Sequence, residues 1–124
     1  MNADQRPARS LAILVCEDEM LIRMDTADLL RELGHRVIEA ADGATALACL
    51  AEPGVDVLWA DVGLPDMNGI DLAHRARGLA PGIAVIHATG DPDPSGPVAG
   101  AIILLKPYGS AAVVAALEDI LSRG

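Results

Sequence analysis

The sequence is poor in aromatic and basic residues. It holds one Trp, one Tyr and no Phe in 124 residues, so any core must be built from aliphatic side chains. Nine Lys and Arg residues face 18 Asp and Glu residues, which gives a formal net charge of -9. Because an acidic surface repels phosphate backbones, this composition argues against direct binding of nucleic acid.

Cysteines and long apolar runs are also scarce. Cys16 and Cys49 are too few for a disulfide framework and fit no zinc motif, so we predict reduced core residues in a cytoplasmic protein. No apolar run is long enough to cross a membrane. The polar start is followed by a short apolar run that stops at "EDE", which is unlike a signal peptide. We predict a flexible tail over 1–9 and one domain over 10–124.

The spacing of apolar residues predicts five strands that alternate with helices. The predicted strands cover 11–15, 36–40, 55–60, 83–88 and 101–105, and the predicted helices lie within 16–34, 43–52, 68–78 and 110–122. Ile22, Leu33 and Ala51 are among the helix residues that we expect to point inward. This alternation favours an α/β fold with a parallel sheet covered by helices on both faces.

One connection departs from the alternation. The segment "GDPDPSGPVAG", residues 90–100, lies where a helix should join the fourth strand to the fifth, yet it holds three prolines and three glycines. A proline inside a helix costs roughly 3 kcal/mol. We therefore predict a loop or a single turn in place of this helix.

Polar residues follow four of the predicted strands at the point where each strand ends. Glu17 and Asp18 follow the first strand, Asp61 the third, Thr89 the fourth and Lys106 the fifth. Taken singly, each has an ordinary explanation: an acid caps the next helix, a Thr turns the chain and a Lys is solvated. Ligands of parallel sheets bind at the carboxyl ends of the strands, so the coincidence favours a site there.

The chemistry of this set is coherent. Clustered carboxylates raise one another's pKa unless a cation lies between them, and oxygen ligands of this kind suit Mg²⁺. An Asp beside Mg²⁺ can attack phosphorus and become an aspartyl-phosphate. Lys106 would neutralise the incoming phosphoryl group, and Thr89 would donate a hydrogen bond to it. Asp66, in the "GLPDMNG" that follows Asp61, is expected to be a turn or cap residue rather than a ligand.

The motifs "CEDE", "WADVGLPDMNG", "HATG" and "LLKPY" occur in an order that resembles the receiver domain of bacterial two-component response regulators. The resemblance runs from about Leu11 to Arg123. It implies a flavodoxin-like three-layer fold with strand order 2-1-3-4-5. It also implies signal transduction through a phosphoprotein that receives its phosphoryl group from a histidine kinase or a histidine phosphotransfer protein.

The same resemblance implies a role for each matching residue. Asp61 would be the phosphoacceptor. Glu17, Asp18 and Asp61 would hold Mg²⁺ together with the backbone carbonyl of Gly63. Thr89 and Lys106 would bind the phosphoryl group, and Pro107 would be the cis-proline of the family.

Two positions depart from the usual receiver pattern. Ile103 occupies the place of the aromatic switch residue, three residues before Lys106. His87 stands where a similar receiver subgroup has the Phe of a Phe-Ala-Thr-Gly motif. For His87 we favour a core-edge histidine with a satisfied ring nitrogen over a pH sensor. We also hypothesise that phosphorylation orders residues 90–100 through Thr89.

The leading interpretation is a phosphorylatable receiver that acts by binding another protein and catalyses only its own phosphorylation and dephosphorylation. The alternatives are a receiver-like adaptor that works without phosphorylation and a Mg²⁺-dependent phosphohydrolase. A phosphohydrolase generally needs a second Asp two residues after the nucleophile, where this chain has Gly63. A flavodoxin-like cofactor module is disfavoured because "CEDE" is too acidic to cradle a phosphate. The sequence does not identify the downstream target. It is compatible with a weak homodimer and with a larger protein of which this chain is one part.

Overall fold

The computed structural model describes residues 10–123 and contains five strands and four helices within them. The strands are β1 (Ala12–Cys16), β2 (Arg36–Ala40), β3 (Val57–Asp61), β4 (Ala84–Thr89) and β5 (Ile102–Leu105). The helices are α1 (Met20–Glu32), α2 (Gly43–Leu50), α3 (Gly69–Leu79) and α4 (Ser110–Ser122). Each predicted element is present, with ends shifted by a few residues. The predicted tail over 1–9 lies outside the described residues.

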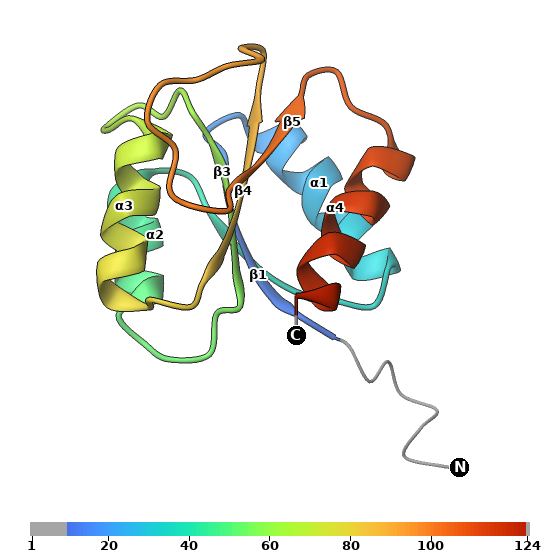
Figure 1. Ribbon diagram of the computed structural model, residues 1–124, viewed down its shortest axis with the longest axis horizontal. Coiled ribbons are helices and arrows are strands. Elements are labelled where there is room, and N and C mark those ends of the chain that lie inside the picture. Colours follow the sequence, from blue (N-terminus) through green and yellow to red (C-terminus); the bar gives the residue numbers. More distant parts are fainter. Residues whose placement is uncertain (1–9, 124) are drawn as a thin grey trace.

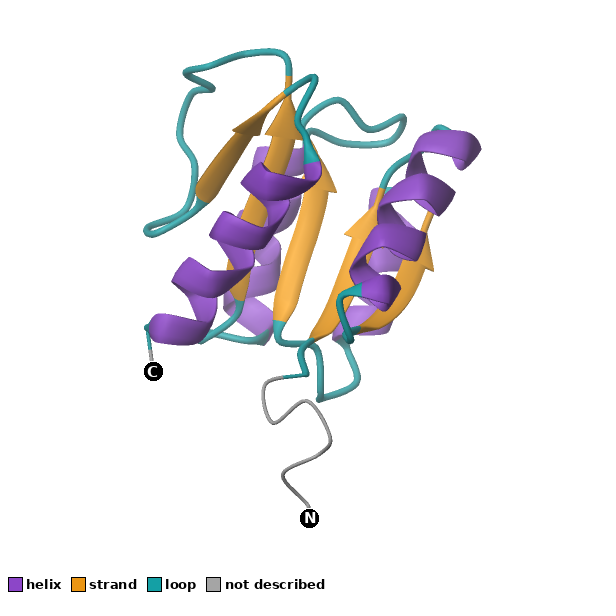
Figure 2. Ribbon diagram, turned by 90° about the vertical axis from the view of Figure 1, so that its right-hand side faces the viewer, coloured by secondary structure: helices purple, strands orange, loops and turns teal. Residues whose placement is uncertain are grey.

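The five strands form one parallel sheet in the order β2-β1-β3-β4-β5. The predicted α/β class and strand order are therefore confirmed. Helices α2 and α3 cover one face, and α1 and α4 cover the other (Figure 1). Figure 2 shows the arrowheads of the strands at a common edge, which is where the candidate site residues follow their strands.

The core has two halves, one on each face of the sheet. The half under α2 and α3 contains Leu58, Leu72 and Val85. The half under α1 and α4 contains Trp59, Ile86 and Val113. As expected from the composition, both halves are mainly aliphatic. In the part of the chain that the structure describes, no helix has the length and apolarity needed to cross a membrane.

Three side chains that were predicted to point inward do not. Ile22 and Leu33 of the α1 region are 37% and 38% exposed, and Ala51 after α2 is also exposed. The buried face of α1 is formed by Thr26, Ala27 and Leu30 instead. Thr26 and Leu30 have the expected helical spacing. Ile22 instead lies in the first turn of α1, and Leu33 and Ala51 are the C-cap residues of α1 and α2, beyond the covered part of each helix.

Residues 90–100 form a loop, as predicted, and no helix occurs between β4 and β5 (the orange segment in Figure 1). Side chains from elsewhere hold its carbonyl groups. His74 Nε2 lies 2.7 Å from Gly96 O, and Arg77 Nη2 donates to Ala99 O over 2.9 Å. Arg123 Nη2 donates to Gly100 O over 3.0 Å. Val98 is buried against the core half under α2 and α3.

The start of α3 lies unusually close to the end of β3. Gly69 N donates to Val62 O over 2.7 Å. A Cβ atom at Gly69 would clash with the backbone oxygen of Asp61, so only a residue without a side chain permits this approach. The helix that follows Asp61 is thereby held against the backbone of Asp61 itself.

We expect Gly69→Ala to lower the free energy of unfolding by about 1–3 kcal/mol, because the added carbon must displace backbone rather than a flexible side chain. Gly78→Ala, in the same helix, is the matched control. Nothing lies within 4 Å of a Cβ there. It should raise stability by about 0.5–1 kcal/mol. Urea unfolding followed by the fluorescence of Trp59 measures both, and equal stability of the two variants would contradict the close-approach argument.

Candidate functional site

Three carboxylates meet at the carboxyl edge of the sheet. Parallel pairing places the end of β1 beside the end of β3, with Cys16 opposite Ala60. Glu17, Asp18 and Asp61 follow directly, and one carboxylate oxygen from each lies within 4.8 Å of the others. Glu17 is buried, Asp61 is half-buried and Asp18 is exposed, so the cluster opens to solvent on one side.

Lys106 brings a positive charge to the same cluster from the end of β5. Its Nζ lies 3.2 Å from Asp61 Oδ2 and 3.8 Å from Glu17 Oε1. The Lys106–Pro107 peptide bond that follows is cis. Lys106 N also donates to Thr89 O over 2.8 Å, which ties the ends of β4 and β5 together.

Burial and neighbouring charges both shift pKa values at the site. Burial raises the pKa of Glu17, the backbone N–H of Glu19 lowers it, and the neighbouring Asp61 raises it again, with a net rise. Partial burial lowers the pKa of Lys106, but the attraction of Asp61 and Glu17 outweighs this and raises it. The cluster therefore holds its ammonium group firmly and would gain from further positive charge.

Thr89 and Gly63 stand at the same edge. The hydroxyl of Thr89 is engaged with the loop, since its Oγ1 accepts from Asp91 N over 3.1 Å. Gly63 forms a bridge with Asn68 across the loop after β3, and its N–H lies 3.4 Å from Asp61 Oδ1. Thr89 is thus the last residue of β4, and Gly63 lies in the loop that follows β3, two residues after Asp61.

Tyr108 contacts the site region and was not singled out by sequence reasoning. Its hydroxyl lies 3.1 Å from Thr26 Oγ1 of α1. Its ring packs edge-on against Trp59, with centroids 5.6 Å apart. Its position two residues after Lys106 could have indicated that it lies near the site. Tyr108 links the segment that carries the ammonium group to both α1 and β3.

His87 differs from the expectation. It is completely buried in β4 rather than lying at the edge of the core. Its Nδ1 lies 3.1 Å from Ala60 O, so one ring nitrogen is satisfied, but Nε2 is buried without a hydrogen-bond partner. Burial lowers its pKa, against the smaller raising effects of the Ala60 carbonyl and Asp61.

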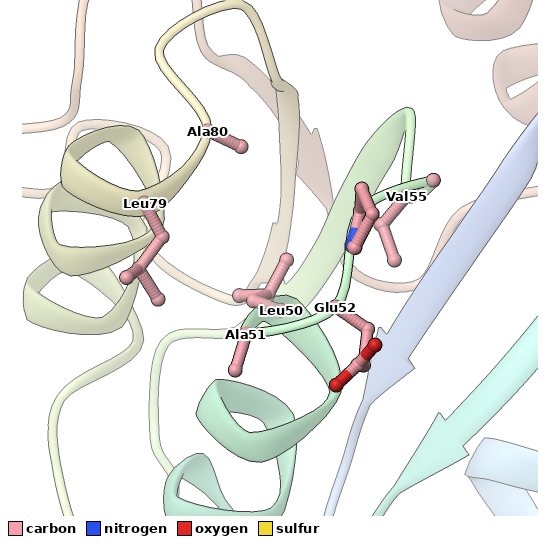
Figure 3. Close-up of a pocket in the computed structure, with 8 residues that line it drawn as sticks. Leu50, Ala51, Glu52, Val55, Leu79 and Ala80 are labelled. Carbon is pink, nitrogen blue, oxygen red and sulfur yellow. The ribbon is translucent and has the colours of Figure 1, made fainter.

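A separate hollow lies near the opposite end of β3 from Asp61. Its volume is about 290 Å³, and it lies between the carboxyl ends of α2 and α3. Figure 3 shows Leu50 and Leu79 on its two sides with Glu52 and Val55 beyond them. It contains none of the predicted site residues, and the chemistry of the chain is concentrated at the other edge.

Comparison with known sequences identifies relatives along nearly the whole chain. A family profile described as "Response regulator receiver domain" matches residues 13–118. The "Transcriptional regulatory protein PdtaR" of Mycobacterium tuberculosis (strain CDC 1551 / Oshkosh) is 40% identical over 119 residues, covering 90% of this chain and 57% of that protein. The "Response regulator receiver protein CpdR" of Brucella abortus (strain 2308) is 31% identical, covering 88% of this chain and 95% of CpdR.

Comparison with solved structures gives the same picture. The receiver domain of the hybrid histidine kinase CckA has a TM-score of 0.79 and 33% identity, covering 89% of this chain and 98% of that chain. A receiver domain protein from Clostridium thermocellum has a TM-score of 0.83 and 28% identity, covering 91% and 95% of the two chains. The chain spans about half the length of the regulators TcrX and PdtaR, 53% and 57% respectively.

We expect His87→Phe to weaken the pH dependence of stability. The unfolded chain takes up a proton on His87 as pH falls through the ordinary value of 6.5, whereas burial keeps the folded chain unprotonated to lower pH. The free energy of unfolding therefore declines below that pH, by about 1.4 kcal/mol for each unit by which the pKa is lowered.

Urea unfolding between pH 7 and pH 5.5 measures this decline. It should be smaller in His87→Phe than in the wild type, because phenylalanine cannot be protonated. His35, whose pKa is also lowered by burial, contributes equally to both proteins and cancels in the comparison. Parallel pH curves for the two proteins would contradict the assignment.

Proposed function

The chain belongs to the response regulator receiver domain family, and we propose that Asp61 accepts a phosphoryl group within a two-component or phosphorelay system. The observation that carries this proposal is the convergence of Glu17, Asp18 and Lys106 on one carboxylate at the edge of the sheet. Asp61 is half-buried, close enough to solvent to be reached and close enough to Lys106 to be held in one orientation.

The donor set fits Mg²⁺. Carboxylate oxygens from Glu17, Asp18 and Asp61 are hard ligands within 4.8 Å of one another. Burial, and to a smaller extent the neighbouring Asp61, raises the pKa of Glu17, and a cation would offset both effects. We propose that these three carboxylates and the carbonyl of Gly63 hold the ion. When bound, Mg²⁺ neutralises negative charge on the carboxylates and on the phosphoryl oxygens.

The proposed reaction is an in-line transfer. A carboxylate oxygen of Asp61 forms a bond to phosphorus while the bond between phosphorus and a histidine nitrogen of the donor breaks, and that nitrogen keeps the bonding electron pair. Lys106, which is paired with Asp61, would then neutralise the negative charge on the phosphoryl oxygens. The hydroxyl of Thr89 would donate to one of those oxygens. Gly63 places no side chain in the path of water that later releases the phosphate.

We propose that the phosphodonor docks beside Lys106. A hollow of about 650 Å³ lies there, lined by Ile22, Asp25, Lys106, Pro107 and Tyr108. Two residues that precede Ile22 in the first turn of α1 are also apolar and exposed, Met20 at 59% and Leu21 at 72%. Apolar surface of this kind beside a reactive group suits a partner protein, and a histidine kinase or phosphotransfer protein supplies the histidine that the chemistry needs.

We place this chemistry in the cytoplasm. Cys16 and Cys49 are both free thiols, which suits a reducing compartment. Burial, followed by the surrounding carboxylates, raises the pKa of Cys16 to about 12. The thiol is therefore uncharged at neutral pH and acts as a core residue rather than as a second nucleophile.

The signal would leave the site through Thr89. Its Oγ1 accepts from Asp91 N, and Asp91 Oδ1 in turn accepts from Asp93 N over 2.9 Å. When the hydroxyl turns to a phosphoryl group, the contact with Asp91 is lost or rearranged, and the start of loop 90–100 changes conformation. No aromatic switch is required, which is consistent with Ile103 at the usual switch position.

We expect incubation with Mg²⁺ and a small acyl phosphate to add one phosphoryl group to the wild type and none to Asp61→Asn. The asparagine keeps the shape of the side chain but lacks the nucleophilic carboxylate. Intact mass measures the addition. A chelator of Mg²⁺ should abolish it in the wild type.

Other outcomes of this experiment identify the alternatives. Modification of both proteins would remove Asp61 as the acceptor. No modification of the wild type, even with a histidine phosphodonor present, would favour an adaptor that works without phosphorylation. Continuous release of phosphate from a generic phosphatase substrate would favour a phosphohydrolase.

We expect a phosphoryl mimic to change amide exchange mainly at residues 91–93. This part of the loop depends on Thr89 and Asp91, whereas 96–100 is held by His74, Arg77 and Arg123. Exchange measured with and without beryllium fluoride and Mg²⁺ tests this, with Thr89→Ala as the control that should show no difference between the two conditions. Identical exchange over 90–100 in the wild type would rule out this route.

A further inference from the structure

Asp66 joins the loop after the phosphoacceptor to a different helix. It lies in the segment 62–68, which connects Asp61 to α3. Its Oδ1 accepts from Gly43 N over 2.8 Å, and its Oδ2 accepts from Ala44 N over 2.9 Å. Both carboxylate oxygens are therefore used by the first two residues of α2, and the two bonds span more than twenty residues of sequence.

The side chain of Met67 supports the same junction. A Cβ atom at Gly43 would lie 2.6 Å from Sδ and Cγ of Met67, so the thioether rests directly on the glycine that begins α2. Asp66 supplies two hydrogen bonds and Met67 supplies close packing, from consecutive positions of one loop. Together they hold residues 66 and 67 of the loop against the N-terminus of α2.

The remaining contacts tie the loop to itself and to α3. Gly63 bridges to Asn68, Gly69 N donates to Val62 O, and Asn68 Oδ1 accepts from Ile70 N over 2.7 Å. These bonds define the shape of the loop. The bonds of Asp66 fix that shape relative to the rest of the molecule.

The first turn of α2 has a cap of its own. Asp42 Oδ1 accepts from Thr45 N over 2.8 Å, which is the usual N-cap contact. Asp66 therefore does not replace a missing cap. What Asp66 adds, and Asp42 does not, is a connection between α2 and the segment that carries Gly63.

We propose that Asp66 is a positioning residue for the magnesium and phosphoryl site. By holding 62–68 against α2, it would set the place of the Gly63 carbonyl relative to Asp61, and so would prepare the ligand set before the ion arrives. This inference rests on the proposed function. Residues that hold metal ligands in place commonly affect the affinity for the metal ion, although they do not contact the ion.

The test compares Asp66→Ala with Asp42→Ala. Both variants remove side-chain bonds to the first turn of α2, but only the first releases loop 62–68. Titration of Mg²⁺ is followed by the fluorescence of Trp59, the one Trp of the sequence, which lies two residues before Asp61 on β3. Urea unfolding without Mg²⁺ measures the stability of each variant separately.

We expect Asp66→Ala to weaken Mg²⁺ binding about tenfold, the lower end of the effect of losing a residue behind a metal ligand. Asp42→Ala should lose stability but bind Mg²⁺ as the wild type does. Asp66→Asn keeps one acceptor oxygen and should bind with intermediate affinity, and it serves as the test variant if Asp66→Ala does not fold. In Asp66→Asn, the rate of phosphorylation should be closer to the wild-type rate at saturating Mg²⁺ than at low Mg²⁺.

Each result has one meaning. Wild-type affinity in both Asp66 variants would overturn the positioning role and leave the proposed function intact. Equal weakening by Asp42→Ala and Asp66→Ala would also overturn it, because the effect would then follow the stability of α2. Absence of Mg²⁺ binding by the wild type would instead overturn the proposed function, and the positioning role with it.

Discussion

Repulsion among three carboxylates at one edge of the sheet is the constraint around which the rest of this molecule is arranged. Parallel pairing of β1 and β3 leaves Glu17, Asp18 and Asp61 within 4.8 Å of one another. An uncompensated cluster of this kind would favour unfolding or protonation. The ammonium group of Lys106 offsets part of the charge from the end of β5. The negative charge that remains would favour a cation at this edge, as the proposed phosphoryl transfer requires.

Much of this could be predicted from the sequence, because the deciding signals are local. Short aliphatic runs of Val, Ile, Leu and Ala define the strands, and the residue after each run is read directly from the chain. Once a parallel sheet is expected, the polar residues after four strands must share an edge. The prolines of 90–100 likewise argue against a helix, because each proline by itself destabilises a helix interior. The α/β class and the grouping of Glu17, Asp18, Asp61 and Lys106 were therefore accessible from local signals, whereas the strand order came from the resemblance to receiver domains.

The features that escaped prediction depend on contacts between distant segments. Asp66 was expected to be a turn or cap residue, and it does accept from the first N–H groups of a helix. That this helix is the distant α2 depends on how the loop after β3 lies on α2. The contact of Tyr108 with Thr26 joins residues far apart in the chain. His87 was expected at the edge of the core, yet it is completely buried in β4. Ile22 and Ala51 show that an apolar residue at helical spacing need not be covered when it lies near the end of its helix.

The anchoring of loop 90–100 has a consequence for the sequences that could replace it. The groups that hold it are main-chain carbonyls of Gly96, Ala99 and Gly100, and every residue has such a carbonyl. The donors belong to α3 and to the end of α4. Three kinds of loop position are still constrained: buried ones such as Val98, the glycines Gly96 and Gly100 with positive φ, and Asp91, whose carboxylate accepts from Asp93 N. At the other loop positions mutational tolerance should be higher than at His74, Arg77 and Arg123. The segment offers a surface whose composition can diverge between paralogues, and so distinguish their partners, without changing the scaffold that carries it.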